Sequence, residues 1–298
     1  MTIISIKNIK KDTTLKKYLL DLLKDQYTSS KISKSIDNGD IKVNGKKSTW
    51  NYILKENDEL RIYLKIKTEN HDFLKSKSEL KVVYEDENII VVNKPRGLVC
   101  QKDANEKYDT LNSRIKKYLF LKNDNSYKDA HLVHRLDKYT FGLCVAGKNL
   151  ETIKLLNNVW NTNAINKYYR CYSYGYFKNK QEMLINYVKF NEEKQMMEID
   201  NANEFNKKIV TSYIVLKQYR NYAELEVKID TGKKHQIRVH LSSIDHPILG
   251  DSKYNKINLL GYKYPCLCSY RIEFNFDSKC HLNYLNNKKI VLDKYNFK

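Results

Sequence analysis

A succession of short β-branched runs, separated by acidic or glycine-containing turns, is the feature that most constrains the fold of this chain. It begins at Leu80 with LKVVYEDENIIVVNKP, where two such runs flank the turn Glu85-Asp86-Glu87-Asn88 and predict a hairpin. Further strand-like runs are LCVAG, YYRCYSYGY, TSYIVL and AELEVKI. Helical patterns lie between them at 110–121, 149–159 and 235–244. This order predicts an α+β domain over 80–298, with a mixed, largely antiparallel sheet and flanking helices.

Residues 1–66 have a different pattern, which predicts a small αα-β unit in front of that domain. Leucines at 15, 19, 22 and 23 recur at helical spacing, and a second helical pattern with Ile32 and Ile36 ends at Asn38-Gly39. IKVNG then reaches the turn signal Asn44-Gly45, and LRIYLKI is a second alternating strand. Residues 67–79 are polar and aperiodic and are interpreted as a linker.

Two helices, a strand, an Asn-Gly turn and a closing strand resemble the S4-type RNA-binding domain, with Val43-Asn44-Gly45 and Asp58 among the matching residues. Such domains bind structured RNA through a basic face. The resemblance makes five lysines candidates for that face, namely Lys31, Lys34, Lys42, Lys46 and Lys47. The alternative is that these lysines form an ordinary solvated surface, because lysine is abundant throughout the chain.

The charge balance points to an anionic partner. The chain has 54 Lys and Arg against 35 Asp and Glu, a formal net charge of +19, which predicts attraction to polyphosphate or to an anionic membrane surface. A membrane is disfavoured because no apolar run approaches the roughly 20 residues that span a bilayer, and the N-terminus lacks a signal-peptide pattern. A cytoplasmic protein that binds nucleic acid is expected, with its six cysteines reduced and mostly buried.

Three segments combine charged, aromatic and glycine residues in patterns that suggest chemistry. HLVHRLDKYTFGL (131–143) places a carboxylate in a predicted loop, although a structural Arg–Asp pair explains that segment equally well by itself. A strand begins at Lys167-Tyr168-Tyr169-Arg170. TGKKHQIRVHLSSIDHPILGDSKY (231–254) contains a short helix, in which Ile237, Leu241 and Ile244 share one face while His235, Arg238 and Ser242 lie on a more polar one.

Together these segments resemble the RluA family of pseudouridine synthases, over about 80–276 and in the correct order. HRLDKYTFGL resembles the family's first motif, Lys167-x-Tyr169 with Gly175 the second, and 231–254 the third, while NKPRGL (93–98) and LCSYRIEF (267–274) also fit. The chain departs from the family pattern at Phe141, where Ser is usual, at Lys233-Lys234, where Arg-Thr is usual, and at Asp245, where Gly is usual. These departures put substrate contacts in doubt more than activity.

The resemblance implies an enzyme that isomerises specific uridines in RNA to pseudouridine and needs no cofactor or metal. It implies that Asp137 is the catalytic carboxylate, as nucleophile or as electrostatic stabiliser. Arg238 would keep that carboxylate charged, Tyr169 would stack on the uracil and assist removal of the proton from carbon 5, and Arg135 would fill the space left by a flipped base. Lys167, Lys233 and Lys234 are candidate phosphate contacts.

The S4-like unit favours large-subunit (23S-type) ribosomal RNA over transfer RNA as the substrate, and a monomer is the default expectation. A non-catalytic RNA-binding factor in ribosome assembly is the main alternative from another functional class. A metal hydrolase is disfavoured because His235 and His240, five residues apart, face differently on a helix or a strand, and no set of acidic ligands accompanies them.

Overall fold

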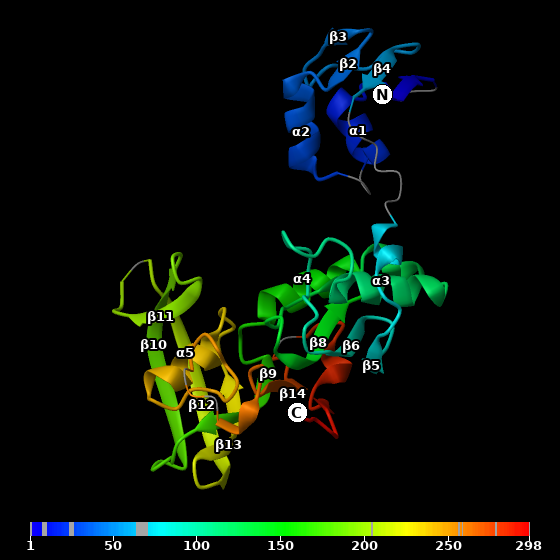
Figure 1. Ribbon diagram of the computed structural model, residues 1–298. Coiled ribbons are helices and arrows are strands. Elements are labelled where there is room, and N and C mark those ends of the chain that lie inside the picture. The colour runs from blue at the N-terminus through cyan, green and yellow to red at the C-terminus, as the bar shows by residue number, and fades with distance from the viewer. Residues whose placement is uncertain are drawn as a thin grey trace. The chain divides into compact units, whose positions relative to one another are not determined.

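The structure is a computed structural model that describes residues 2–7, 11–23, 27–63, 71–203, 205–255, 257, 259–277 and 279–297. The chain divides into two compact units, Met1–Asn70 and His71–Lys298 (Figure 1). Each unit has its own hydrophobic core. Within the described residues, no helix is both long enough and apolar enough to cross a membrane. All six cysteines are free thiols and five are buried, as predicted.

The first unit packs two helices on a small antiparallel sheet with the order β1-β4-β2-β3. Its elements are β1 (Thr2–Ser5), α1 (Leu15–Leu23), α2 (Ser29–Asn38), β2 (Ile41–Val43), β3 (Lys46–Lys47) and β4 (Glu59–Ile62). The Thr28 hydroxyl accepts a hydrogen bond from the Lys31 amide at the start of α2, and Gly39 ends that helix with φ 81°. The two predicted helices are confirmed, whereas β1 was not predicted.

The predicted turn at Asn44-Gly45 is also confirmed, and buried Asp58 fixes it to the loop before β4. Asn44 and Gly45 have φ values of 50° and 74°, as a two-residue hairpin turn of this type requires. Asp58 Oδ1 accepts a hydrogen bond of 2.7 Å from Nδ2 of the Asn44 side chain, and Asn44 Oδ1 accepts one of 2.8 Å from the backbone amide of Glu59. The Asn44-Gly45 turn and Asp58 therefore stabilise each other through these hydrogen bonds.

The second unit is built on an 11-stranded sheet with the main order β11-β10-β12-β13-β9-β14-β8-β6-β5. In the described residues β14 and β8 pair in parallel and the other strand pairs are antiparallel, so the predicted mixed, largely antiparallel α+β fold is confirmed. The strands are β5 (Lys81–Glu85), β6 (Ile89–Lys94), β7 (His131–Leu132), β8 (Phe141–Gly147), β9 (Ile165–Tyr174), β10 (Gln181–Asn191), β11 (Met196–Asp200), β12 (Lys207–Gln218), β13 (Tyr222–Ile229), β14 (Leu267–Phe274) and β15 (Lys289–Val291).

Three α-helices flank this sheet: α3 (Leu111–Leu121), α4 (Leu150–Val159) and α5 (Gln236–Ser243). Each lies within two residues of a helix predicted from the sequence. Helix α4 packs on β8, whereas α5 packs on β11 and β12, which lie toward the other end of the strand order (Figure 1). In the strand order, β13, β9 and β14 therefore lie between β12, which contacts α5, and β8, which follows the loop that contains Asp137.

Residues 71–79 differ from the predicted linker because they pack on the second unit. Phe73 is 9% exposed, and its ring lies 5.7 Å from the rings of both Phe120 and Tyr127. The Lys117 ammonium donates hydrogen bonds to the carbonyls of Leu74 and Ser76. The polar composition of this segment concealed these contacts, which depend on partners more than 40 residues away; residues 67–70 lie outside the described residues.

Candidate active site

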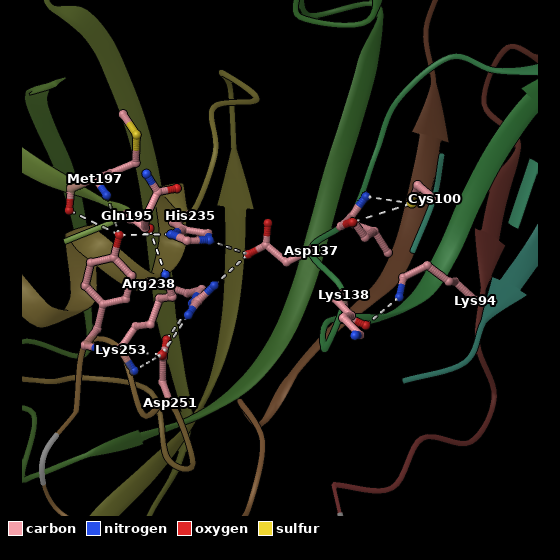
Figure 2. Close-up of polar contacts among 12 residues, drawn as sticks. Lys94, Cys100, Asp137, Lys138, Gln195, Met197, His235, Arg238, Asp251 and Lys253 are labelled. Atoms are coloured by element: carbon pink, nitrogen blue, oxygen red, sulfur yellow. Dashed lines mark hydrogen bonds and ion pairs between the residues drawn. The ribbon is translucent and has the colours of Figure 1, made fainter. Parts of the chain in front are cut away.

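The loop that carries Asp137, between β7 and β8, is held on both sides of the carboxylate. One residue before it, the Leu136 amide donates to Cys100 Sγ at 3.2 Å, and the Leu136 carbonyl lies 3.5 Å from the same sulfur. One residue after it, the Lys138 carbonyl accepts a hydrogen bond of 3.0 Å from the fully buried Lys94 ammonium. Figure 2 shows the contacts of Cys100 and of Lys94 beside Asp137. The backbone at Asp137 is therefore positioned by the NKPRGLVC segment.

Gly142 brings this loop close to the strand that pairs with Tyr169. A Cβ atom at Gly142 would lie 2.2 Å from the Ser269 carbonyl oxygen, and its φ of 112° is one that residues with side chains rarely adopt. Ser269 on β14 pairs with Gly142 on one side and with Tyr169 on the other. The glycine in the first motif therefore allows the close packing that joins the first motif to the second.

Arg238 on α5 binds two carboxylates at once. Its Nη1 donates to Asp137 Oδ2 at 2.9 Å, while its Nε and Nη2 donate to the two oxygens of Asp251 at 2.6 and 2.8 Å (Figure 2). Asp251 is completely buried, and the Asp137 side chain remains 29% exposed. Burial lowers the pKa of Arg238, but the hydrogen bonds and charges of Asp251 and Asp137 outweigh it and raise that pKa above its ordinary value. The guanidinium is a fixed positive charge beside an accessible carboxylate.

His235 and Tyr254 complete the surroundings of this ion pair. His235 stands at the start of α5 with φ 55°, its Nε2 lies 3.7 Å from Asp137 Oδ2, and its Nδ1 lies 3.1 Å from the Tyr254 hydroxyl. Tyr254 is anchored in turn to the backbone of Met197 on β11. Burial lowers the pKa of His235 to about 4, so its ring is neutral near pH 7. A neutral ring leaves Arg238 as the cation bonded to Asp137.

Tyr169 lines a recess of about 60 Å³ together with Asp137 and Arg238. It is 7% exposed and lies on the buried face of β9. Burial raises the pKa of Tyr169 far above its ordinary value, so the phenol is protonated at neutral pH. The structure thus brings together the three residues predicted as catalytic, each from a different motif.

A larger cavity of about 520 Å³ opens in front of Asp137 and is predominantly basic. Seven of its lining residues are Lys or Arg and three are Asp. Arg135 and Lys234, two predicted RNA contacts, line this cavity, and exposed Lys233 lines the smaller recess. Of the three acids, Asp251 is neutralised by Arg238, so the cavity suits a polyanion that brings one reacting group to Asp137.

The prediction that Lys167 contacts phosphate is wrong for this structure. Lys167 is 3% exposed, and its ammonium donates a 2.6 Å hydrogen bond to the carbonyl of Trp160. Burial lowers the pKa of Lys167 to about 8. Its place on β9 explains the error, because residues two apart on a strand share a face and Lys167 shares that of buried Ile165 and Tyr169.

The five lysines predicted to bind RNA in the first unit lie at or near its surface. Four are exposed and Lys42 is partly buried, with its ammonium 5.5 Å from the Tyr63 ring. Their contact with RNA stays a prediction. Among the residues that the structure describes, no group of three or more His, Cys, Asp or Glu side chains is arranged to hold a metal ion.

Two of the three departures from the family pattern have clear structural settings. Phe141 is buried, with the Arg96 guanidinium 4.8 Å above its ring and Phe297 packed against its edge at 5.8 Å. Asp245 has φ 60°, a conformation that favours glycine and that aspartate tolerates better than most residues. Neither side chain lines the two cavities at Asp137. Phe141 therefore belongs to the packing beside the site, whereas Asp245 is exposed at the turn that follows α5.

The sequence interpretation did not include Asp251, Tyr254 or His235 among the site residues. All three belong to the third motif, and a signal was present, because a buried arginine is often held by a bidentate carboxylate. The Gly-Asp pair at 250–251 offered that group. The structure shows that Asp251 makes the two-point contact and Asp137 the single one.

Comparisons with known proteins identify the family to which the chain is similar. Residues 88–243 match the family model described as RNA pseudouridylate synthase. A protein of Mycoplasma capricolum subsp. capricolum named uncharacterized RNA pseudouridine synthase is 36% identical over 287 residues, 92% of each chain. The ribosomal large subunit pseudouridine synthase D of Borreliella burgdorferi is 29% identical and covers 81% of this chain and 76% of its own.

The fold also resembles that of a solved human protein, RNA Pseudouridylate Synthase Domain Containing 4, with a TM-score of 0.59 and 21% identity. That similarity covers 73% of this chain and 89% of the human one. The family model spans more than half of the chain and includes Asp137, Tyr169 and Arg238. By sequence and by fold, the chain belongs to the RNA pseudouridylate synthase family.

Proposed function

We propose that this RNA pseudouridine synthase isomerises uridines in large-subunit ribosomal RNA, with Asp137 as its catalytic carboxylate. The observation that carries the proposal is the 2.9 Å contact between Asp137 and Arg238 in the lining of a basic cavity. Relatives named ribosomal large subunit pseudouridine synthase D, about 29 to 33% identical to this chain, support that RNA as the substrate.

The reaction breaks the bond between ribose carbon 1′ and uracil N1, turns the base, and forms a bond from carbon 1′ to carbon 5. Carbon 5 loses a proton and N1 gains one, so nothing is oxidised or reduced. Positive charge develops at carbon 1′ as the first bond breaks, and an ionised carboxylate there acts as nucleophile or as electrostatic stabiliser. The Arg238 guanidinium is a fixed positive charge 2.9 Å from Asp137 Oδ2, beside the carbon at which the bond breaks.

The recess beside Asp137 requires the uridine to leave its stack. Extruding a base costs a few kcal/mol, which contacts in the complex must offset. Exposed Arg135, two residues before Asp137, is placed to enter the vacated space. Tyr169 offers its ring to the uracil, and because burial keeps its phenol protonated, its oxygen is too weak a base to take the carbon 5 proton unaided.

We further propose that the first unit is an S4-like domain that docks the enzyme on structured RNA. Its two helices and four-stranded sheet carry five lysines on α2 and on the β2–β3 hairpin, four of them exposed and Lys42 partly buried. These residues are Lys31, Lys34, Lys42, Lys46 and Lys47. Lysine contacts with phosphate give affinity and register but little choice of sequence. Choice of the uridine then falls to the cavity at Asp137 and to the shape of the RNA.

The direct test is an assay of the purified full chain on separate transcripts of large-subunit ribosomal RNA and of transfer RNA. The proposal expects pseudouridine in the ribosomal transcript, and the same rate after dialysis against EDTA. Product in transfer RNA alone would keep the reaction and overturn the substrate. Loss of rate that one metal restores would overturn the expectation of a metal-free reaction.

A further inference from the structure

Two exposed tyrosines form a stacked pair inside the cavity in front of Asp137. The rings of Tyr139 and Tyr264 are nearly parallel, with centroids 4.3 Å apart and an interplanar angle of 14°. Both residues line the 520 Å³ cavity, yet 37% of Tyr139 and 41% of Tyr264 remain exposed. Each ring covers one face of the other, so the pair presents aromatic surface to whatever occupies the cavity.

The backbone holds this pair in a fixed relation to the catalytic ion pair. The Thr140 amide donates to the Asp137 carbonyl at 3.1 Å, so Tyr139 is the third residue of a turn that begins at Asp137. The Tyr264 carbonyl oxygen lies 2.2 Å from where a Cβ atom of Gly250 would be. Gly250 precedes Asp251, the residue that clamps Arg238. The tyrosines are therefore anchored to the two segments that build the site.

Cations accompany the aromatic faces. The Lys138 ammonium lies 5.7 Å from the centre of the Tyr139 ring, and Lys263 precedes Tyr264; both lysines line the cavity. Aromatic faces next to basic side chains are the combination by which proteins hold single-stranded nucleic acid, because bases stack on the rings while phosphates contact the cations. Neither tyrosine lines the smaller recess that contains Tyr169.

We propose that Tyr139 and Tyr264 form a stacking site for an RNA base that neighbours the isomerised uridine. The proposal rests on the proposed function, since it takes the reacting uridine to lie in the recess between Asp137 and Tyr169. A base on the tyrosine pair belongs to an adjacent nucleotide, whose phosphate is within reach of Lys138 or Lys263. This contact holds the RNA strand open next to the flipped uridine.

A second stacked pair provides a matched control. Tyr219 and Tyr222 have centroids 4.4 Å apart and an interplanar angle of 7°, with the Lys217 ammonium 4.9 Å from the Tyr219 ring. Neither residue lines the cavity at Asp137. The Tyr219→Leu variant therefore removes an equivalent aromatic pair away from the proposed site.

The first experiment measures stacking without catalysis. Single-stranded RNA of nine uridines, with 2-aminopurine at one position in turn, is titrated with the full chain, and stacking quenches the fluorescence of the probe. We expect quenching with the unsubstituted enzyme, Tyr264→Phe and Tyr219→Leu, and its loss with Tyr264→Leu. Equal quenching by Tyr264→Leu, or none with the unsubstituted enzyme at saturation, overturns the proposal even if the enzyme makes pseudouridine.

The second experiment is a double-mutant cycle between enzyme and RNA, on an RNA that the enzyme modifies. Tyr264→Leu should lower kcat/KM by about 5- to 150-fold, the range found for removal of one base–aromatic stack. Replacing the stacked nucleotide by an abasic residue should cause a similar loss, with little further loss when the two changes are combined. Independent, multiplicative losses at every position that flanks the target would overturn the assignment. An enzyme that modifies no RNA would overturn the proposed function and leave the fluorescence result to decide the stacking site.

Discussion

Arg238 joins Asp137 to Asp251, two carboxylates that are 114 positions apart in the chain, through three hydrogen bonds of 2.6 to 2.9 Å. The contact with Asp251 is two-pronged and buried, whereas the contact with Asp137 uses one nitrogen. The guanidinium is therefore oriented before any substrate arrives. Its Nη1 is directed at the carboxylate that is accessible from the cavity.

We predict that Arg238→Lys lowers kcat by on the order of 10²-fold or more, the loss typical when one preorganised electrostatic contact is removed. A lysine places a point charge near one carboxylate and cannot reproduce the planar contact with both. RNA affinity should change much less, and the exposed Arg220→Lys variant should behave like the unsubstituted enzyme. Single-turnover rates and binding isotherms separate these effects. An unchanged kcat for Arg238→Lys would refute this role.

Cys100 is predicted to position Asp137 through the backbone of Leu136. In Cys100→Val the Leu136 amide and carbonyl lose their sulfur partner, at a cost of about 1–3 kcal/mol in stability for groups left unsatisfied. The kcat should fall while RNA affinity holds, and Cys100→Ser should recover part of the rate because a hydroxyl can still bond both groups. The partly buried Cys280→Val serves as the control. Equal rates for Cys100→Val and Cys280→Val would contradict this positioning role.

His240 is predicted to make the folded state less stable in mild acid. It is completely buried, and neither ring nitrogen has a hydrogen-bond partner among the described residues; burial lowers its pKa to about 4. An unfolded histidine takes up a proton below about pH 6.5, so this contribution to stability is complete above that pH and is lost as the pH falls toward 4. Between pH 7.5 and pH 5 the loss is on the order of 2 kcal/mol.

Urea denaturation of the unsubstituted enzyme and of His240→Phe at both pH values measures this loss. The variant removes the titrating ring and keeps an aromatic side chain, so its stability should fall less on acidification, whatever its stability at pH 7.5. An identical decrease for the two proteins would show that His240 does not titrate in this range.

Removal of residues 1–70 is predicted to weaken RNA binding and to reduce its dependence on salt. Residues 71–298 contain their own core and all residues of the candidate site, so kcat at saturating RNA should be retained. In the full chain, changing Lys31, Lys34, Lys42, Lys46 and Lys47 to Gln should reduce the slope of log K against log salt, because fewer phosphates are then neutralised by the protein. Unchanged affinity and slope in both proteins would exclude RNA docking by this unit.

The features that could be predicted from the sequence are those formed by residues close together in the chain. The turn at Asn44-Gly45, the caps of α2 and the helix around Arg238 depend on residues within one or two turns of chain, so their patterns were sufficient. The assembly of Asp137, Tyr169 and Arg238 was predictable only because the three motifs resemble those of one family. Spacing alone leaves open how strands from three segments pair.

The features that were predicted wrongly or missed depend on contacts between segments far apart in the chain. Lys167 was treated as a surface cation because lysine usually is one, although alternation on β9 places it beside Tyr169 on the buried face. Strands β10 and β11 were not predicted, because much of β10 is exposed and its pattern is correspondingly weak. Asp251 was missed although it lies in the third motif, because its contact with Arg238 depends on how the loop after α5 packs back on that helix.

The central claim is that Asp137 makes pseudouridine in large-subunit ribosomal RNA. The most direct test is a pseudouridine map of total RNA from cells in which the chromosomal gene is deleted and replaced by a plasmid copy. The copy encodes either the unsubstituted protein or the Asp137→Asn variant, and controls establish that the two proteins are expressed equally and bind RNA equally. The account predicts that discrete signals in large-subunit ribosomal RNA return with the unsubstituted gene and stay absent with Asp137→Asn. Restoration of those signals by Asp137→Asn would contradict it.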